Sequence, residues 1–573
     1  MQSIHAADDD SSLSQLLPFE HRSLGLIDKP DTAILCGCKA GTSTGRRPKR
    51  PHQHLHPLPT ISKFKMLSLV DSYPLTTIIV ILTTTFCAAV AHYRRGRHRL
   101  PLPPGPRKLP IVGNLFDIPS TFQWKAYAKW AKEFDSDIIH LNVCGTSIIV
   151  LSSLEATDML LEKRIYSDRP RFPMLNELMG WDWNIASKRK LKLTPFTHYC
   201  IARRTQRRLL QETLNSKKIQ QYEEVELAGA RKLLERLLHS PERWEEHVRH
   251  MAGELIMAVT YGIQVLPSQD PYIATAHEAV RSLSTASLPG RFLVDTFPIL
   301  KYIPRWMPGA EFKRQAEKWT KVARDMIELP FAETKRQMEC GTAPPSVCAN
   351  SLDALLDPTQ EPLYYNENQI KHVAGALFVG GADTTVYAIS NFILAMIWYP
   401  EVQKKAQAEI DEVIGRRGLP EFADRKETPY VMAVVLEVLR WKTVGPLALP
   451  RSVTEDDQYR GYRIPAGSVV LGNAWAILHD ERLYPDPYTF NPERFLLNGK
   501  LDPEVRSPDM VFGFGRRRCP GKPLALSSVW ITIVSMLAAY DIGKAVDENN
   551  GGVIEPTYEN TPGSITFVSF GFP

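Results

Sequence analysis

A ten-residue stretch near the C-terminus, Phe512 to Gly521, reads FGFGRRRCPG and constrains the chain more than any other segment. Its one cysteine, Cys519, lies among glycines and arginines, so a thiol packed in an apolar core is the poorer interpretation. The guanidinium groups of Arg516, Arg517 and Arg518 favour the thiolate, which is a metal ligand. Neither cysteine nor histidine follows at the spacing of a zinc or iron–sulfur site. The pattern therefore predicts a single thiolate ligating a group that brings its own other ligands, as haem does.

The residues around this cysteine suit a flat ligand. Gly515 and Gly521 let the backbone turn tightly and approach closely, and Phe512 can cover the sulfur. Arg517, two residues before Cys519, could donate charge-assisted hydrogen bonds to a propionate. The pattern F-x-x-G-x-R-x-C-x-G resembles the haem-binding loop of the cytochrome P450 monooxygenases, with Cys519 as the axial iron ligand. By itself the motif leaves open a chance Gly/Arg turn with an idle thiol.

A second motif lies in residues 372–392, HVAGALFVGGADTTVYAISNF, which read as a long buried helix. Gly380-Gly381 and the hydroxyl of Thr384 predict a kink in this helix, and a buried Asp383 is costly without a partner or a task. The arrangement resembles the oxygen-activating groove of the same family. That resemblance implies that Thr384 supplies a hydroxyl for oxygen activation and that Asp383 relays protons from solvent. The alternative is a structural kink with an aspartate that reaches the surface.

The third motif, VVLEVLRW, sets Glu437 and Arg440 on one face of a helix. Such a pair is usually an exposed ion pair of small value, but its apolar neighbours predict burial, which demands further partners. Arg494 in NPERF is the candidate partner. The family resemblance makes these three residues a structural network around the haem loop.

Residues 443–453, TVGPLALPRSV, follow this helix, and the resemblance implies that they run past the haem. Val444, Leu447 and Leu449 are then candidates for substrate contact. Arg451 is a candidate partner for a haem propionate, because its guanidinium can bind a carboxylate.

The expected tryptophan of the other propionate site is absent. After ELMGWDWN, which resembles a loop of fungal family members, the family pattern W-x-x-x-R should follow. The chain instead has Arg203 where a tryptophan would precede Arg207, so either Arg207 or Arg208 could bind the propionate. We hypothesise a retained intron or a mis-joined exon within residues 185–206.

Composition excludes some other classes of protein. The chain has 573 residues, 44% of them hydrophobic, enough for a large core. A net charge of +6 without a basic stripe argues against nucleic-acid binding. The eight cysteines are scattered, which predicts a reducing compartment and no disulfide framework.

The N-terminal region predicts a membrane anchor. Residues 1–65 are polar and lack periodicity, which predicts disorder, and we hypothesise that they extend the gene model upstream of a start at Met66. Residues 72–91 carry no charge over twenty positions, the length of a bilayer span, within an anchor of residues 66–100. A cleavable signal peptide is the alternative. The arginines that follow the span favour an uncleaved anchor with its catalytic domain in the cytosol.

Residues 101–573 are predicted to form the catalytic domain. Residues 101–114 read as a proline-rich connector, followed by an amphipathic helix with Trp124 and Tyr127, and by a hairpin near residues 138–151. Residues 294–312 resemble an apolar loop that dips toward the membrane; a core-packed connector is the alternative.

Together the three motifs resemble fungal microsomal cytochromes P450 of the O-methylsterigmatocystin oxidoreductase-like type. The resemblance implies a mainly α fold with small β-sheets, with haem b between the acid–Thr helix and the cysteine helix. It implies a single-pass protein of the endoplasmic reticulum membrane, in contact with lipid, that inserts one oxygen atom from O2 into an apolar small molecule, in fungal secondary metabolism or xenobiotic oxidation.

Electrons would come from NADPH-cytochrome P450 reductase, because the chain has no dinucleotide-binding G-x-G-x-x-G unit. The expected docking face lies near Arg516, Arg518 and Lys522. Two alternatives stay open: a haem-thiolate isomerase or dehydratase, which needs no reductase, and a haem protein inactivated by the unusual segment 185–206.

Overall fold

The structure, a computed structural model, describes residues 78–88, 100–189, 198–287, 290–357, 364–415, 418–546, 551–560 and 568–571. The chain divides into two compact units, residues 1–91 and 92–573. In the first unit the described residues form one apolar helix, Ile78–Ala88, which lies within the predicted span. The predicted disordered leader, residues 1–65, and both ends of the span lie outside the described residues.

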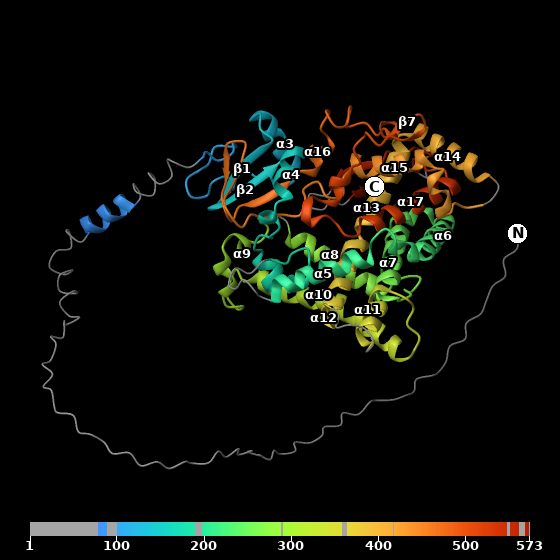
Figure 1. Cartoon of the computed structure of the whole chain (residues 1–573), viewed down its shortest axis with the longest axis horizontal. Helices are drawn as coiled ribbons and strands as arrows, with labels where there is room; N and C mark the ends of the chain where they lie inside the picture. Colours follow the sequence, from blue (N-terminus) through green and yellow to red (C-terminus); the bar gives the residue numbers. More distant parts are fainter. Residues whose placement is uncertain are drawn as a thin grey trace, which may run out of the picture. The chain divides into compact units, whose positions relative to one another are not determined.

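The second unit is mainly helical, as predicted, and its small sheet lies at one side of the helices (Figure 1). Its α-helices, in chain order, are α3 (Gln123–Glu133), α4 (Leu154–Leu161), α5 (His198–Thr213), α6 (Glu223–His239), α7 (Trp244–Tyr261), α8 (Pro271–Ala286), α9 (Leu293–Thr296), α10 (Glu311–Glu339), α11 (Val347–Leu356), α12 (Glu367–Ala382), α13 (Thr384–Trp398), α14 (Pro400–Ile414), α15 (Pro429–Trp441), α16 (Ala474–Leu478) and α17 (Lys522–Ala539).

The largest sheet has four strands in the order β1-β2-β6-β3. Strands β1 (Ile138–Val143) and β2 (Thr146–Leu151) form the predicted antiparallel hairpin. Cys144 and Gly145 turn it with φ angles of 46° and 87°, so Cys144 is a turn residue. Strand β6 (Val469–Gly472) runs parallel to β2, and β3 (Arg451–Ser452) pairs with β6 on its other side.

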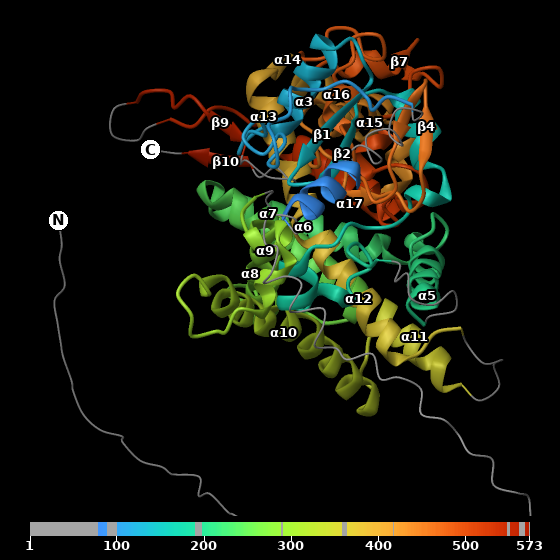
Figure 2. The same ribbon diagram turned by 90° about the vertical axis from the view of Figure 1, so that its left-hand side faces the viewer.

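Three antiparallel pairs complete the strands described. They are β4 (Asp457–Tyr459) with β5 (Tyr462–Ile464), β7 (Leu496–Leu497) with β8 (Lys500–Leu501), and β9 (Thr557–Asn560) with β10 (Val568–Gly571). Figure 2 shows the β9–β10 pair at the margin of the second unit.

The proline-rich connector, residues 101–114, contains no helix, as predicted, and it is fixed to the sheet. The N–H of His140 in β1 donates to the carbonyl of Pro104 at 2.8 Å. A Cβ on Gly105 would lie 2.2 Å from the carbonyl oxygen of His140, so only glycine permits this approach. The connector therefore forms part of the catalytic unit.

The helix predicted over residues 372–392 is longer, from 367 to 398, and breaks at Asp383 into α12 and α13. The hydroxyl of Thr384 donates to the carbonyl oxygen of Gly380 at 2.7 Å, the interaction that bends helices. A Cβ on Gly381 would lie 2.7 Å from Ile256 of α7, so this glycine permits close packing at the bend. The predicted kink is confirmed.

Both halves of this helix lie in the core. Ala382 at the end of α12, Leu209 of α5 and Leu524 near the start of α17 belong to one hydrophobic cluster. Helix α13 and the rest of α17 pack in a second cluster with α14 and α15. The first cluster therefore brings together the three helix segments that carry Asp383, Arg207 and Cys519.

Candidate active site

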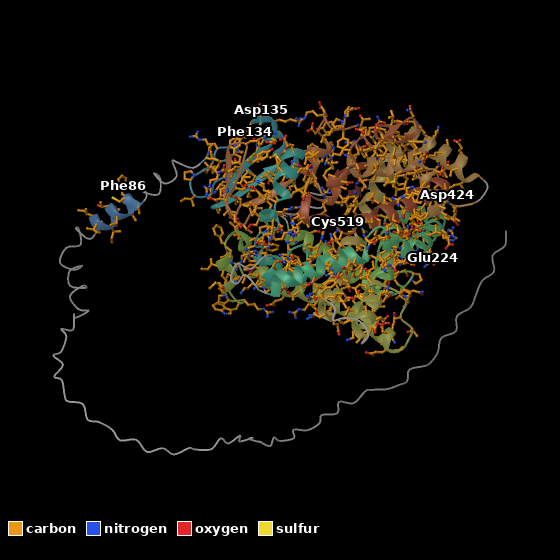
Figure 3. The ribbon with its side chains drawn as sticks, viewed as in Figure 1. Phe86, Phe134, Asp135, Glu224, Asp424 and Cys519 are labelled. Atoms are coloured by element: carbon orange, nitrogen blue, oxygen red, sulfur yellow. The ribbon has the colours of Figure 1, made fainter. Side chains whose placement is uncertain are left out.

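Cys519, labelled in Figure 3, is surrounded by protein, because desolvation is the main influence on the pKa of its thiol. Its residue surface is nevertheless exposed. These two properties together mean that its free surface faces inward, onto space between the elements around it. Cys348 provides the contrast among the described cysteines, since it is fully buried in apolar packing. Cys519 therefore has the accessibility that a ligand requires.

The start of α17 surrounds this sulfur. Desolvation raises the pKa of the Cys519 thiol, while the backbone N–H groups of Gly521 and Lys522 and the charge of Arg207 act in the opposite direction. The helix N-terminus adds its partial positive charge. The prediction assigned this role to Arg516–Arg518, but Arg516 and Arg518 reach Glu162. The guanidinium that favours the Cys519 thiolate is that of Arg207 on α5, which is far from Cys519 in the sequence.

The glycines of the loop have different roles. A Cβ on Gly515, whose φ is 45°, would lie 2.3 Å from the carbonyl oxygen of Leu161, so the loop touches the end of α4. Gly521 has an ordinary φ of −81°, and a Cβ there would be in normal contact with the Cys519 sulfur at 3.7 Å. Of these two glycines, only Gly515 is required by the protein's own packing. The carbonyl of Phe512 accepts a hydrogen bond from the Cys519 N–H at 2.7 Å, which closes the loop.

Arg451 joins the loop to α4. It is buried and donates to the carbonyl of Leu161 at 2.9 Å and to the carbonyl of Phe514. Burial lowers its pKa to about 10, Glu162 raises it, and the charge of Arg207 lowers it further. Arg451 and Arg207 are therefore neighbours of like charge.

Arg517 connects the loop to the unusual segment. Its Nε, Nη1 and Nη2 donate to the carbonyls of Ser167, Ile185 and Lys188 at 3.1, 3.0 and 3.2 Å. These contacts anchor residues 185–188 on the cysteine loop. Residues 190–197 of the unusual segment lie outside the described part of the chain.

The structure separates Arg207 from Arg208. Arg208 is exposed, donates to Glu212 at 2.7 Å and stacks over the ring of Tyr364. Arg207 turns inward toward Cys519, and burial lowers its pKa. It donates no hydrogen bond to another residue of the described chain. Arg207 is thus the better candidate for an anionic ligand.

Asp383 occupies the break between α12 and α13 and is 7% exposed. Desolvation raises the pKa of its carboxyl group, whereas the charges of His277 and Arg249 lower it. His277 is exposed on α8, and Arg249 lies on α7. A carboxyl with a raised pKa at a helix break, with polar groups leading toward the surface, can carry protons.

The buried ion-pair network is present as predicted. Glu437 and Arg440 are fully buried and share two hydrogen bonds of 2.7 Å. The Nε of Arg494 donates to Glu437 at 3.2 Å, and Arg440 also donates to the carbonyls of Leu478 and Pro487. Because each charge has several partners, the network ties α15 to the chain that precedes the cysteine loop.

Comparison with known proteins identifies the family. The profile described as Cytochrome P450 matches residues 103–554. Cytochrome P450 monooxygenase 98 of Postia placenta is 45% identical over 85% of this chain and 93% of its own. Tryptamine 4-monooxygenase of Psilocybe cyanescens is 41% identical over 82% of this chain and 92% of its own length.

The chain belongs to the cytochrome P450 family. As in other cytochromes P450, the cofactor is haem, and the activity is that of a haem-thiolate monooxygenase, which uses O2, an organic substrate and a redox partner.

The residues of this cytochrome P450 fit haem. An accessible interior thiol at a helix N-terminus suits a thiolate ligand. Two neighbouring guanidiniums of like charge, Arg207 and Arg451, suit the two carboxylates of a porphyrin. Arg451 and Arg517 both donate to backbone carbonyls as well, Arg451 to two and Arg517 to three.

Sequence reasoning missed one buried cation of this P450. Arg169 donates to the carbonyls of Leu449 and Pro450, both at 2.7 Å, and is 6% exposed. It therefore holds the segment that leads into Arg451. In the sequence it stands in a polar loop before proline, where nothing distinguishes it from a surface arginine.

The three candidates for substrate contact have different environments. Leu447 is buried in a cluster with Trp124 and β2, Val444 is half-buried and Leu449 is 49% exposed. Leu449 and Val444 therefore have apolar surface available for a ligand, whereas most of Leu447 is already covered.

Proposed function

We propose that this P450 oxygenates an apolar small molecule with Cys519 as its axial thiolate, in fungal secondary metabolism or xenobiotic oxidation. The observation that carries this assignment is the accessible sulfur of Cys519 in the interior, beside Arg207 and the N-terminus of α17. When bound, the haem supplies the activation of O2 and the insertion of one oxygen atom.

In this proposal the residues of the chain itself bind the cofactor and orient the substrate. Arg207 and Arg451 hold the propionates, Gly515 and Phe512 shape the loop, and Gly521 leaves room beside the sulfur. Asp383 takes up protons from the side of Arg249 and His277, and the Thr384 hydroxyl presents a hydrogen bond at the bend. Val444 and Leu449 line the path of the substrate. This acid–Thr pair favours a monooxygenase over an isomerase or dehydratase, neither of which needs protons delivered to activated oxygen.

The first unit serves as the membrane anchor in this proposal. In helix Ile78–Ala88 the hydroxyls of Thr83 and Thr84 donate to the carbonyls of Ile79 and Val80 at 2.6 and 2.8 Å. Thr85 makes the same kind of bond. Internally satisfied hydroxyls among exposed apolar side chains suit a bilayer, where water cannot satisfy them. We place this single span in the endoplasmic reticulum membrane, with the second unit in the cytosol.

A second contact with lipid comes from the segment 294–312. Trp306 and Tyr302 are 79% and 73% exposed, which argues against a core-packed connector. Such aromatic side chains suit the membrane interface. The two longest apolar helices described, Glu367–Trp398 and Lys522–Ala539, are mostly buried and belong to the core.

NADPH-cytochrome P450 reductase is the proposed electron donor. Arg516 and Arg518 are exposed beside the cysteine loop, and Lys522 pairs with Asp509 at 2.7 Å. Basic side chains on the thiolate side of the haem would steer an acidic partner.

A carbon monoxide difference spectrum of the reduced protein tests the central assignment. We expect a red-shifted Soret band of the thiolate type, lost in Cys519→Ser, while Cys348→Ser retains it. A protein that takes up no haem, or a Cys519→Ser variant with an unchanged band, would overturn the proposal.

A further inference from the structure

A cavity of about 350 Å³ lies away from the haem loop, between α3, the end of α15 and α16. Helices α3 and α16 lie side by side in both Figure 1 and Figure 2. This volume is at the lower end of the range for small-molecule sites. Its lining includes neither Cys519 nor Arg207, Arg451, Asp383 or Thr384.

The walls of the cavity are aromatic. The rings of Trp475 and His479 stack with centroids 4.4 Å apart and an angle of 22°, and His479 lies 5.3 Å from the ring of Tyr488. Trp124 and Trp441 contribute further surface. Tyr488 is 59% exposed, so the cavity opens to solvent on that side. Such walls favour a flat, unsaturated ligand.

Positive charge faces the same space. Lys125 of α3 is exposed and Lys442, just after α15, is half-buried, and both line the cavity. Burial and, as the smaller cause, the charge of Lys125 together lower the pKa of Lys442 to about 8. An anion near both ammonium groups would relieve this repulsion.

The other titratable groups around the cavity add no negative charge. The pKa of His479 is lowered to about 3, chiefly by desolvation and also by Arg440, Lys442 and Lys125, so its ring is neutral. Arg440 is positive and already neutralised by Glu437. The charges that act on Lys442 and His479 from α3 and α15 are thus all positive.

We propose that this cavity binds an aromatic carboxylate, with its ring against Trp475 and His479 and its carboxylate between Lys125 and Lys442. The cavity shares no lining residue with the cysteine loop, residues 512–521, and the proposal does not depend on the function proposed above.

Calorimetric titration of the full-length haem-loaded protein with 2-naphthoate tests the proposal, with the Soret band recorded in parallel. We expect one equivalent to bind without a change in the Soret band. Lys442→Met and Lys125→Met should each weaken binding at least tenfold, and Lys442→Arg should retain it. Lys129→Met is the matched control, because Lys129 lies on α3 and is 75% exposed beside Glu133.

Two further measurements exclude general apolar binding. The neutral isostere 2-naphthamide should bind at least tenfold more weakly than 2-naphthoate. At pH 8, binding of 2-naphthoate should take up protons in the parent protein but not in Lys442→Met, because the anion favours the charged ammonium. Equal affinity of the Lys442→Met variant, absence of proton uptake, or binding seen only with a Soret shift would overturn the proposal.

Discussion

Glu437 and Arg440 share two hydrogen bonds of 2.7 Å with both side chains completely removed from solvent. One helical turn therefore carries two opposite charges that only each other, Arg494 and nearby backbone groups can compensate. Because each charge is buried and depends on the other for compensation, the network stabilises the chain around the haem loop.

Glu437→Gln should destabilise the second unit by about 3 to 5 kcal/mol, because it leaves Arg440 buried without its counter-charge. Urea unfolding and haem content measure this loss. Glu333→Gln is the control, since Glu333 pairs with Arg336 at 2.7 Å on the surface and its loss should cost less than about 1 kcal/mol. Similar losses in the two variants would contradict the structural role of the buried network.

Arg207→Met should weaken haem retention about tenfold or more, the value of a lost charge-assisted hydrogen bond. Arg208→Met should leave haem retention unchanged, because that guanidinium pairs with Glu212 on the surface. Transfer of haem to apomyoglobin measures both rates. An equal or larger effect of Arg208→Met would show that the inward-facing arginine has been misassigned.

Thr384→Ala should uncouple NADPH oxidation from product formation, since it removes the hydroxyl at the bend between α12 and α13. Thr384→Ser, which keeps the hydroxyl, should remain mostly coupled. The ratio of product to NADPH consumed measures this, with any substrate that shifts the Soret band. Unchanged coupling in Thr384→Ala would remove the proposed role of this residue.

Glu226 predicts a pH dependence of stability. It lies buried between α6 and α17 and accepts a hydrogen bond from the Ser527 hydroxyl at 2.5 Å. Burial raises its pKa to about 8. Between pH 4.5 and 8 the unfolded chain releases this proton while the folded protein keeps it. The contribution of Glu226 to the free energy of unfolding is therefore fully present below about pH 4.5, and it is lost as the pH rises through 8.

Glu226→Gln should remove this dependence and stabilise the protein at pH 8 by an amount on the order of 2 kcal/mol. Urea unfolding at pH 5 and pH 8 measures the difference. Glu224→Gln, on the exposed side of the same helix (Figure 3), should keep the parent's pH dependence. A Glu226→Gln variant that loses stability as steeply as the parent would contradict the raised pKa.

Local pattern was sufficient for several parts of the fold. The spacing of Trp124 and Tyr127 predicted α3, and two strand-like runs on either side of Cys144-Gly145 predicted the β1–β2 hairpin. The glycines with Thr384 predicted the break at Asp383. Each of these depends on interactions between residues a few positions apart, which a sequence displays directly.

The residues that contact the candidate site were harder to predict from local sequence patterns. The charge beside Cys519 was assigned to its sequence neighbours, but two of those arginines reach Glu162 and the third reaches backbone carbonyls. The guanidinium that favours the Cys519 thiolate belongs to Arg207. The guanidinium that binds the carbonyl of Leu449 belongs to Arg169. The direction in which a side chain points depends on the helices and strands packed around it, and these are distant from it in the sequence.

The sequence by itself determined the family, the break in the helix at Asp383 and the buried pair of Glu437 and Arg440, because each depends on a short motif with its own chemistry. The same kind of motif predicts Cys519 as the thiolate. The tertiary structure alone decided that Arg207 faces inward while Arg208 faces outward. It also gathered Lys125, Lys442, Trp475 and His479 around one cavity. Those residues come from three separate elements, and only packing brings separate elements together.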